Sequence, residues 1–176
     1  MSAIDWPGEI FRALHGEAVR IVGYVPDAGH KRLIELCQAD RDMRSVVLTT
    51  EEEGIGLAAG AWLGGVRSVL LMQSSGVGNC INILGMTREC RLPLLILVTM
   101  RGEEGEFNPW QVPMGQATAT VLEAMDVNVH RVLAAEEAGA AVRAAVRRAY
   151  AGNSAHAILI AQRLIGIKSF QQQAAQ

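Results

Sequence analysis

Short aliphatic runs alternate with helical patterns along almost the whole chain. The runs that indicate strands cover residues 18–25, 45–50, 68–73, 93–100, 128–133 and 156–161. The helical patterns between them cover residues 27–39, 51–64, 80–90 and 134–151. This alternation predicts an α/β fold, an open, mostly parallel six-stranded sheet with helices on both faces. Asp27 is placed to cap the first of these helices.

The length of 176 residues suits one domain with a substantial core, and no repeat or linker divides the chain. We expect residues from about 1 to 17 to form an N-terminal extension, and residues 168–176 to form a tail. Half of the residues are hydrophobic and only 5% are aromatic, so aliphatic side chains must fill the core. Strands buried on both faces of a parallel sheet have this composition.

Charge and cysteine content exclude several classes of function. The net charge is −2 and no basic block occurs, so nucleic-acid binding is not expected. The longest apolar run, residues 92–100, is too short to cross a bilayer. The three cysteines, Cys37, Cys80 and Cys90, lack metal-ligand spacing. We therefore expect reduced thiols, a cytoplasmic protein and no metal ligands in this chain.

Polar and glycine-rich residues gather in the segments that follow the predicted strands. These segments are residues 25–30, 49–54 and 73–79, and a long loop over 101–116. In open parallel sheets, ligands bind at the carboxyl ends of the strands. The segment 73–79 lacks a phosphate-binding pattern, and a plain tight turn is the favoured interpretation. No Ser/His/Asp order stands out, and His30 is expected to be solvated or satisfied in the core.

Three adjacent acids, Glu51, Glu52 and Glu53, precede a helix of unusually small residues. One interpretation is a charged first turn, stabilised by the helix dipole by roughly 0.3–1 kcal/mol. The small residues instead indicate that another helix or a ligand approaches the backbone closely. Position alone does not choose among the three acids.

Four segments in order resemble one family closely: "EEEGIGLAAGAWLGG" (51–65), "LLMQSSGVGNCINIL" (70–84), "PLLILVTMRGEEGE" (93–106) and "QVPMGQAT" (111–118). They resemble the pyrimidine-binding domain of thiamine-diphosphate-dependent 2-oxoacid decarboxylases, in particular the sulfopyruvate and phosphonopyruvate decarboxylase group. The likeness covers nearly the whole chain. The resemblance implies a carbon–carbon lyase that uses thiamine diphosphate and Mg²⁺.

The resemblance also implies roles for individual residues. The catalytic glutamate of the family lies nine residues before the glycine of an Ala-x-Gly step, which places it at Glu51, nine before Gly60. In this family the glutamate hydrogen-bonds the ring nitrogen of the aminopyrimidine. The cofactor-binding positions implied beside it are Pro26, Gln73, Ser74, Ser75, Gly76 and Asn79. The implied substrate-binding positions are Asp27, His30, Arg101 and Gln111, although a solvent-exposed role for Arg101 is equally open.

Family members bind the diphosphate and Mg²⁺ through a Gly-Asp-Gly motif, which these 176 residues lack. The resemblance therefore implies an α subunit that needs a β subunit carrying the diphosphate-binding domain, and self-association is also expected. A sulfopyruvate-like substrate is favoured. Phosphonopyruvate or another short 2-oxoacid is the first alternative, and a non-catalytic homologue that forms a homo-oligomeric binding or regulatory module is the second.

Overall fold

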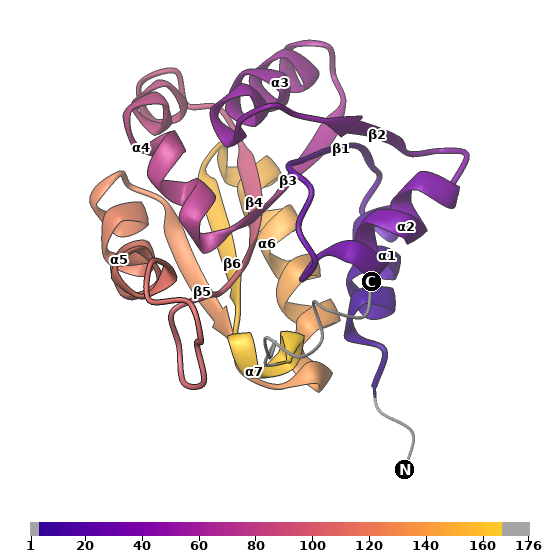
Figure 1. Cartoon of the computed structure of the whole chain (residues 1–176). Helices are drawn as coiled ribbons and strands as arrows, with labels where there is room; N and C mark the ends of the chain where they lie inside the picture. The colour runs from indigo at the N-terminus through magenta and orange to yellow at the C-terminus, as the bar shows by residue number, and fades with distance from the viewer. Residues whose placement is uncertain (1–3, 167–176) are drawn as a thin grey trace.

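The computed structural model describes residues 4–166, which fold around a six-stranded sheet (Figure 1). The strands are β1 (Val19–Tyr24), β2 (Arg44–Val47), β3 (Arg67–Gln73), β4 (Leu94–Thr99), β5 (Asn128–Val132) and β6 (Ala155–Ile160). They lie in the order β2-β1-β3-β4-β6-β5, and every neighbouring pair is parallel. The predicted α/β fold with an open six-stranded sheet is therefore confirmed.

Helices cover both faces of the sheet (Figure 1). The helices are α1 (Trp6–Gly16), α2 (Lys31–Ala39), α3 (Glu51–Leu63), α4 (Ser74–Glu89), α5 (Gln111–Ala124), α6 (Ala138–Gly152) and the short α7 (Gln162–Ile165). A 3₁₀ turn, η1 (Ala135–Glu137), leads into α6. Helices α1, α2 and α6 pack on one face, and α3, α4 and α5 pack on the other. In the part of the chain that the structure describes, no helix is long and apolar enough to cross a membrane.

The central strand β4 shows why the aliphatic runs predict the sheet so well. Leu95 and Leu97 point into the core on the α1/α2/α6 side, whereas Leu94, Ile96 and Val98 point into the core on the other side. All five side chains are at most 1% exposed. Each contributes about 1.5–3 kcal/mol by leaving water. A strand covered on both faces needs no polar alternation.

The expected N-terminal extension contains a helix that belongs to the core. Trp6, Ile10 and Leu14 of α1 are buried, and the helix packs against α6. Asp5 caps α1 by accepting a hydrogen bond from the Gly8 N–H at 3.3 Å. The same carboxylate pairs with Arg32 of α2 at 2.7 Å, which ties α1 to α2. The expected tail, residues 168–176, lies outside the described residues.

The structure corrects three local predictions: the start of α2, the turn over 73–79 and the end of the loop over 101–116. Helix α2 begins at Lys31, and Asp27 does not cap it but binds side chains of β3 and β4. In the segment 73–79, Gln73 ends β3 and residues 74–79 begin α4, so no tight turn separates them. The loop predicted over 101–116 ends at Trp110, because α5 begins at Gln111. Pro113 lies in the first turn of α5, where the missing N–H costs no hydrogen bond.

The order of the strands creates a switch point at the carboxyl ends of the neighbouring strands β1 and β3. From β1 the chain passes to β2 on one side, and it then returns to β3 and continues to the other side. The connections that leave the carboxyl ends of β1 and β3 therefore run in opposite directions. Such a switch point is where ligands bind in open α/β sheets. The loop after β1, residues 25–30, and the start of α4 border it.

Candidate active site

Glu51 is the first residue of α3 and its side chain is buried, with the residue 8% exposed. The amide of Asn79, on α4, donates a hydrogen bond to Glu51 Oε2 at 2.8 Å. Gly76 lies directly against the carboxylate, and a Cβ at this position would overlap Glu51 Oε1. The carboxylate therefore occupies a cradle that only glycine at position 76 leaves free.

The two neighbouring acids have different surroundings. Glu52 is exposed. Glu53 accepts hydrogen bonds from the Thr49 N–H at 2.9 Å and from Thr49 Oγ1 at 2.8 Å. These two hydrogen bonds, chiefly the one from the backbone, hold the pKa of Glu53 below its usual value. Glu53 thus fixes the start of α3, in the manner of a capping box. Among the three acids, Glu51 alone is buried.

The small residues of α3 divide into two groups. Gly54 packs against the sheet, where a Cβ would overlap the side chain of Leu70. Gly56 and Gly60 are exposed, and a Cβ on either of them would meet nothing within 4 Å. Close packing within the chain therefore explains Gly54. It does not explain Gly56 and Gly60.

Side chains at the carboxyl ends of β1, β3 and β4 form one hydrogen-bond network. Gln73 donates to Asp27 Oδ1 at 3.0 Å and accepts a hydrogen bond from Ser75 at 3.0 Å. Thr99 donates to Asp27 Oδ2 at 2.5 Å. The buried Ser74 hydroxyl accepts the Arg101 N–H at 3.1 Å. The network joins the loop after β1 to both strands across the switch point.

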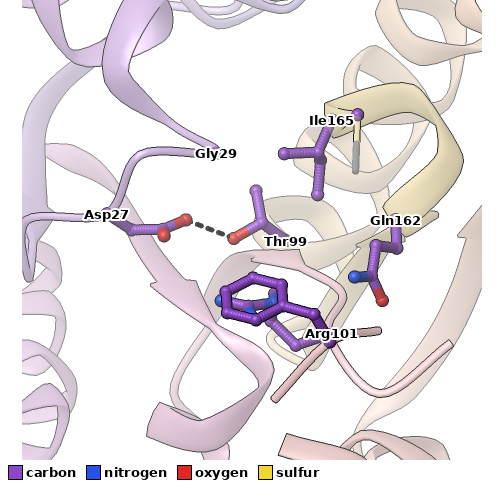
Figure 2. A pocket seen from close by; sticks show the side chains of 8 residues that line it. Asp27, Gly29, Thr99, Arg101, Gln162 and Ile165 are labelled. Carbon is purple, nitrogen blue, oxygen red and sulfur yellow. Dashed lines mark hydrogen bonds between the residues drawn. The ribbon is translucent and has the colours of Figure 1, made fainter. Parts of the chain in front are cut away.

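The Asp27 carboxylate borders a small cavity that Figure 2 shows from close by. The cavity has a volume of about 20 Å³, room for about one water molecule. Thr99, Arg101, Gln162 and Ile165 line it together with Asp27. Burial alone raises the pKa of Asp27, but the hydrogen bonds that its carboxylate accepts, chiefly the one from Thr99, lower it, and the pKa lies below its usual value. Asp27 is therefore ionised at neutral pH.

His30 is fully buried beneath this loop. Its Nε2 lies 3.2 Å from the carbonyl oxygen of Met72 and 3.1 Å from that of Leu97. Carbonyls only accept hydrogen bonds, so Nε2 carries the proton. Burial lowers the pKa of His30, which makes the imidazole neutral at pH 7. In this conformation Nε2 contacts backbone carbonyls rather than the cavity, whereas Nδ1 is buried with no hydrogen-bond partner in the described part of the chain.

Arg101 forms a bidentate ion pair with Glu106, with Nε and Nη2 at 2.7 and 2.6 Å from the carboxylate. The side chains are 15% and 1% exposed. The Glu106 carboxylate also accepts hydrogen bonds from Gly102, Asn108 and Gln162. The Arg101 guanidinium lowers the pKa of Glu106 to about 2. Arg101 is thus paired and largely buried rather than solvent-exposed.

The remaining implied residues lie at the same edge. Pro26 is exposed in the loop after β1, beside Asp27. Gln111 begins α5, and its Oε1 is buried with no hydrogen-bond partner in the described part of the chain. Sequence reasoning missed Thr99, Glu106 and Gln162. The one signal for Thr99 in the sequence is that it is a polar residue at the end of a predicted strand. Glu106 and Gln162 have no such signal, because they meet through a contact between segments distant in the sequence.

Comparison with known proteins extends these observations. The α subunit of sulfopyruvate decarboxylase from Methanococcus maripaludis is 39% identical over 119 residues, 67% of this chain and 71% of that subunit. Phosphonopyruvate decarboxylase from Streptomyces viridochromogenes is 34% identical over 121 residues, 68% of this chain and 30% of that enzyme. No protein-family model matches the chain.

A solved structure shares the fold. The 2-oxoglutarate:ferredoxin oxidoreductase from Magnetococcus marinus superimposes with a TM-score of 0.71 over 91% of this chain and 29% of its own, at 12% identity. The fold and the sequence relatives place the chain in the class of decarboxylase subunits. Within that class, the chain belongs to the family of sulfopyruvate decarboxylase α subunits.

Proposed function

We propose that the chain is the α subunit of a thiamine-diphosphate-dependent decarboxylase that acts on 3-sulfopyruvate. The observation that carries the proposal is the buried Glu51 carboxylate at the start of α3, oriented by Asn79 and seated against Gly76. It stands where the family resemblance expects the catalytic acid. Relatives named as sulfopyruvate decarboxylase α subunits support the substrate class.

The residues at this edge fit the pyrimidine half of the cofactor. Thiamine diphosphate, when bound, supplies the nucleophilic carbon and the electron sink for loss of carbon dioxide. Glu51 would hold a proton between its carboxylate and the ring nitrogen of the pyrimidine. Asn79 fixes the direction of the carboxylate by binding Oε2, and Gly76 keeps the space beside Oε1 clear of a side chain. The buried position keeps water from competing for that proton.

The second half of the cofactor site would come from a partner, a β subunit with the diphosphate-binding domain and its Mg²⁺. Support comes from the relatives that are named as α subunits. The surface of α3 supports it too, because Gly56 and Gly60 leave its backbone accessible and Leu63 is 81% exposed. Self-association of the resulting complex is part of the proposal. The free cysteines suit the reducing cytoplasm.

Phosphonopyruvate is the second candidate substrate, because a phosphonopyruvate decarboxylase is 34% identical to this chain. The deciding experiment is co-expression with a subunit that carries Gly-Asp-Gly and a downstream asparagine. The purified complex is then assayed with sulfopyruvate, phosphonopyruvate and pyruvate. We expect the highest kcat/KM for sulfopyruvate. A higher kcat/KM for phosphonopyruvate would assign that compound as the substrate instead. No turnover with any 2-oxoacid would favour a non-catalytic binding module.

A further inference from the structure

Thr99 ends β4 and makes a short hydrogen bond to a loop far from it in the sequence. Its hydroxyl donates to Asp27 Oδ2 at 2.5 Å across 72 residues. Gly29 makes this approach possible, because a Cβ at position 29 would lie 2.9 Å from both Asp27 Oδ2 and Thr99 Cγ2. The loop after β1 therefore lies against the end of β4 only because residue 29 has no side chain.

His30 attaches the same loop at a second point. Its protonated Nε2 lies within 3.2 Å of carbonyl oxygens on β3 and β4. The side chain is fully buried, and α2 begins at the next residue. Gln73 adds a third attachment through its hydrogen bond to Asp27 Oδ1 at 3.0 Å. Both carboxylate oxygens of Asp27 are therefore held by side chains of the two central strands.

We propose that Thr99 is a positioning residue that fixes the Asp27 carboxylate as a hydrogen-bond acceptor at the mouth of the cavity, with His30 holding the loop. An ionised carboxylate accepts hydrogen bonds and repels anions. Asp27 then orients an N–H or O–H donor, or a cationic group, and does not anchor the sulfonate of the substrate. This last step rests on the proposed function, whereas the positioning of Asp27 does not.

The charges that face Asp27 agree with this assignment. His30, from the start of α2, is neutral because it is buried. Arg101, from the segment after β4, is paired with Glu106 and also attracts Asp27 electrostatically. Lys31 lines an open groove beside Asp27 at the start of α2 and is exposed. The hydrogen bond from the Thr99 hydroxyl, at 2.5 Å, is nevertheless the largest single interaction that favours the ionised Asp27 carboxylate.

The test is an NMR titration of aspartate carboxyl groups in the isolated full-length chain. Thr99→Val removes the hydroxyl and keeps the shape, and Thr99→Ser restores the hydroxyl. We expect the Asp27 pKa to rise by about one unit in Thr99→Val, the scale of one hydrogen bond to a charged group, and to return in Thr99→Ser. An Asp27 pKa that does not move in Thr99→Val overturns the proposal. Thr99→Ala repeats the test should the valine variant not fold.

The assembled complex provides a second readout. Thr99→Val should move the acid limb of the kcat/KM profile to higher pH, and Thr99→Ser should restore it. A purely structural role for Thr99 would lower the rate at every pH and leave the profile in place. The two proposals fail separately. A titration that behaves as expected in a chain whose complex has no decarboxylase activity retains the positioning of Asp27 and rejects the proposed function.

Discussion

Two buried carboxylates at the carboxyl-terminal edge of the sheet, Glu106 beside Arg101 and Glu51 beside Asn79, differ in how many hydrogen bonds they accept. At the Arg101 end, the Glu106 carboxylate accepts five hydrogen bonds, from Arg101, Gly102, Asn108 and Gln162. At the Glu51 end, Asn79 is the one side chain within residues 4–166 that donates to the buried carboxylate. The hydrogen bonds of the Glu106 carboxylate are therefore all made within the chain. The Glu51 carboxylate can still accept a hydrogen bond from a bound group.

This difference indicates that Glu106 stabilises the fold, whereas Glu51 is suited to binding a ligand. Buried polar groups are normally hydrogen-bonded, so a saturated carboxylate such as Glu106 has a structural role. A buried carboxylate with unused acceptor sites, next to a glycine that keeps space open, is suited to a ligand. The contrast predicts that substitutions at the Glu51 end reduce activity and leave folding intact. Substitutions at the Arg101 end should reduce stability first.

The largest expected effect is that of Glu51→Gln. The amide cannot hold the proton that the pyrimidine ring requires, so we expect kcat of the assembled complex to fall by about 10²–10⁴-fold or more. Thermal unfolding of the isolated chain should change little. Glu52→Gln is the matched control, because Glu52 is exposed in the same helical turn. Near-full activity of Glu51→Gln would show that another group is the catalytic acid.

Gly76→Ala tests the cradle without changing a charged group. The added Cβ overlaps the Glu51 carboxylate and must displace it. A displacement of about 1 Å at a catalytic group costs on the order of 100-fold in rate. Gly78→Ala is the control on the same helix, because its Cβ would meet only Met114 Sδ, at 3.4 Å. Equal kcat values for the two variants would contradict the proposed geometry of Glu51.

Glu106→Gln tests whether the fully hydrogen-bonded Glu106 carboxylate stabilises the fold. Loss of one partner from a buried, hydrogen-bonded pair costs about 3 kcal/mol, which urea unfolding at pH 7 measures. The exposed Glu104→Gln is the control. The pKa of Glu106 lies at about 2, below its usual 4.5, so its contribution to stability is present above pH 4.5. That contribution is lost as the pH falls toward 2. The difference between wild type and variant should shrink over the same range, and a constant difference would contradict the ion pair.

The smallest expected effect belongs to the open glycines of α3. Gly60→Ala should stabilise the isolated chain by up to ~1 kcal/mol, because alanine favours a helix and the new Cβ meets nothing within 4 Å. The same variant should bind the partner subunit more weakly, which sedimentation or calorimetry can measure. Gly54→Ala, where the Cβ overlaps Leu70, should instead destabilise the chain. Unchanged binding by Gly60→Ala would remove α3 from the proposed interface.

The sequence predicts the sheet well because buried parallel strands are continuous aliphatic runs. The run 93–100 differs from β4 by one residue at each end. The predicted start of α2 was wrong. Asp27 is a residue type that often caps helices, but its carboxylate instead accepts a hydrogen bond from Thr99, 72 residues away. The pairing of Arg101 with Glu106 lies in a loop, where no periodicity indicates which side chains meet. Glu51 was singled out by the resemblance, since its burial depends on how α4 packs against α3.

The central claim is that this chain holds half of an active site, with Glu51 as its acid. The most direct measurement is the rate of carbon dioxide release from 3-sulfopyruvate as the partner subunit is titrated into the chain, with thiamine diphosphate and Mg²⁺ present. The account predicts no turnover by either subunit alone and a rate that saturates at a fixed ratio of the two. Turnover by this chain alone, or none at any ratio, would contradict it.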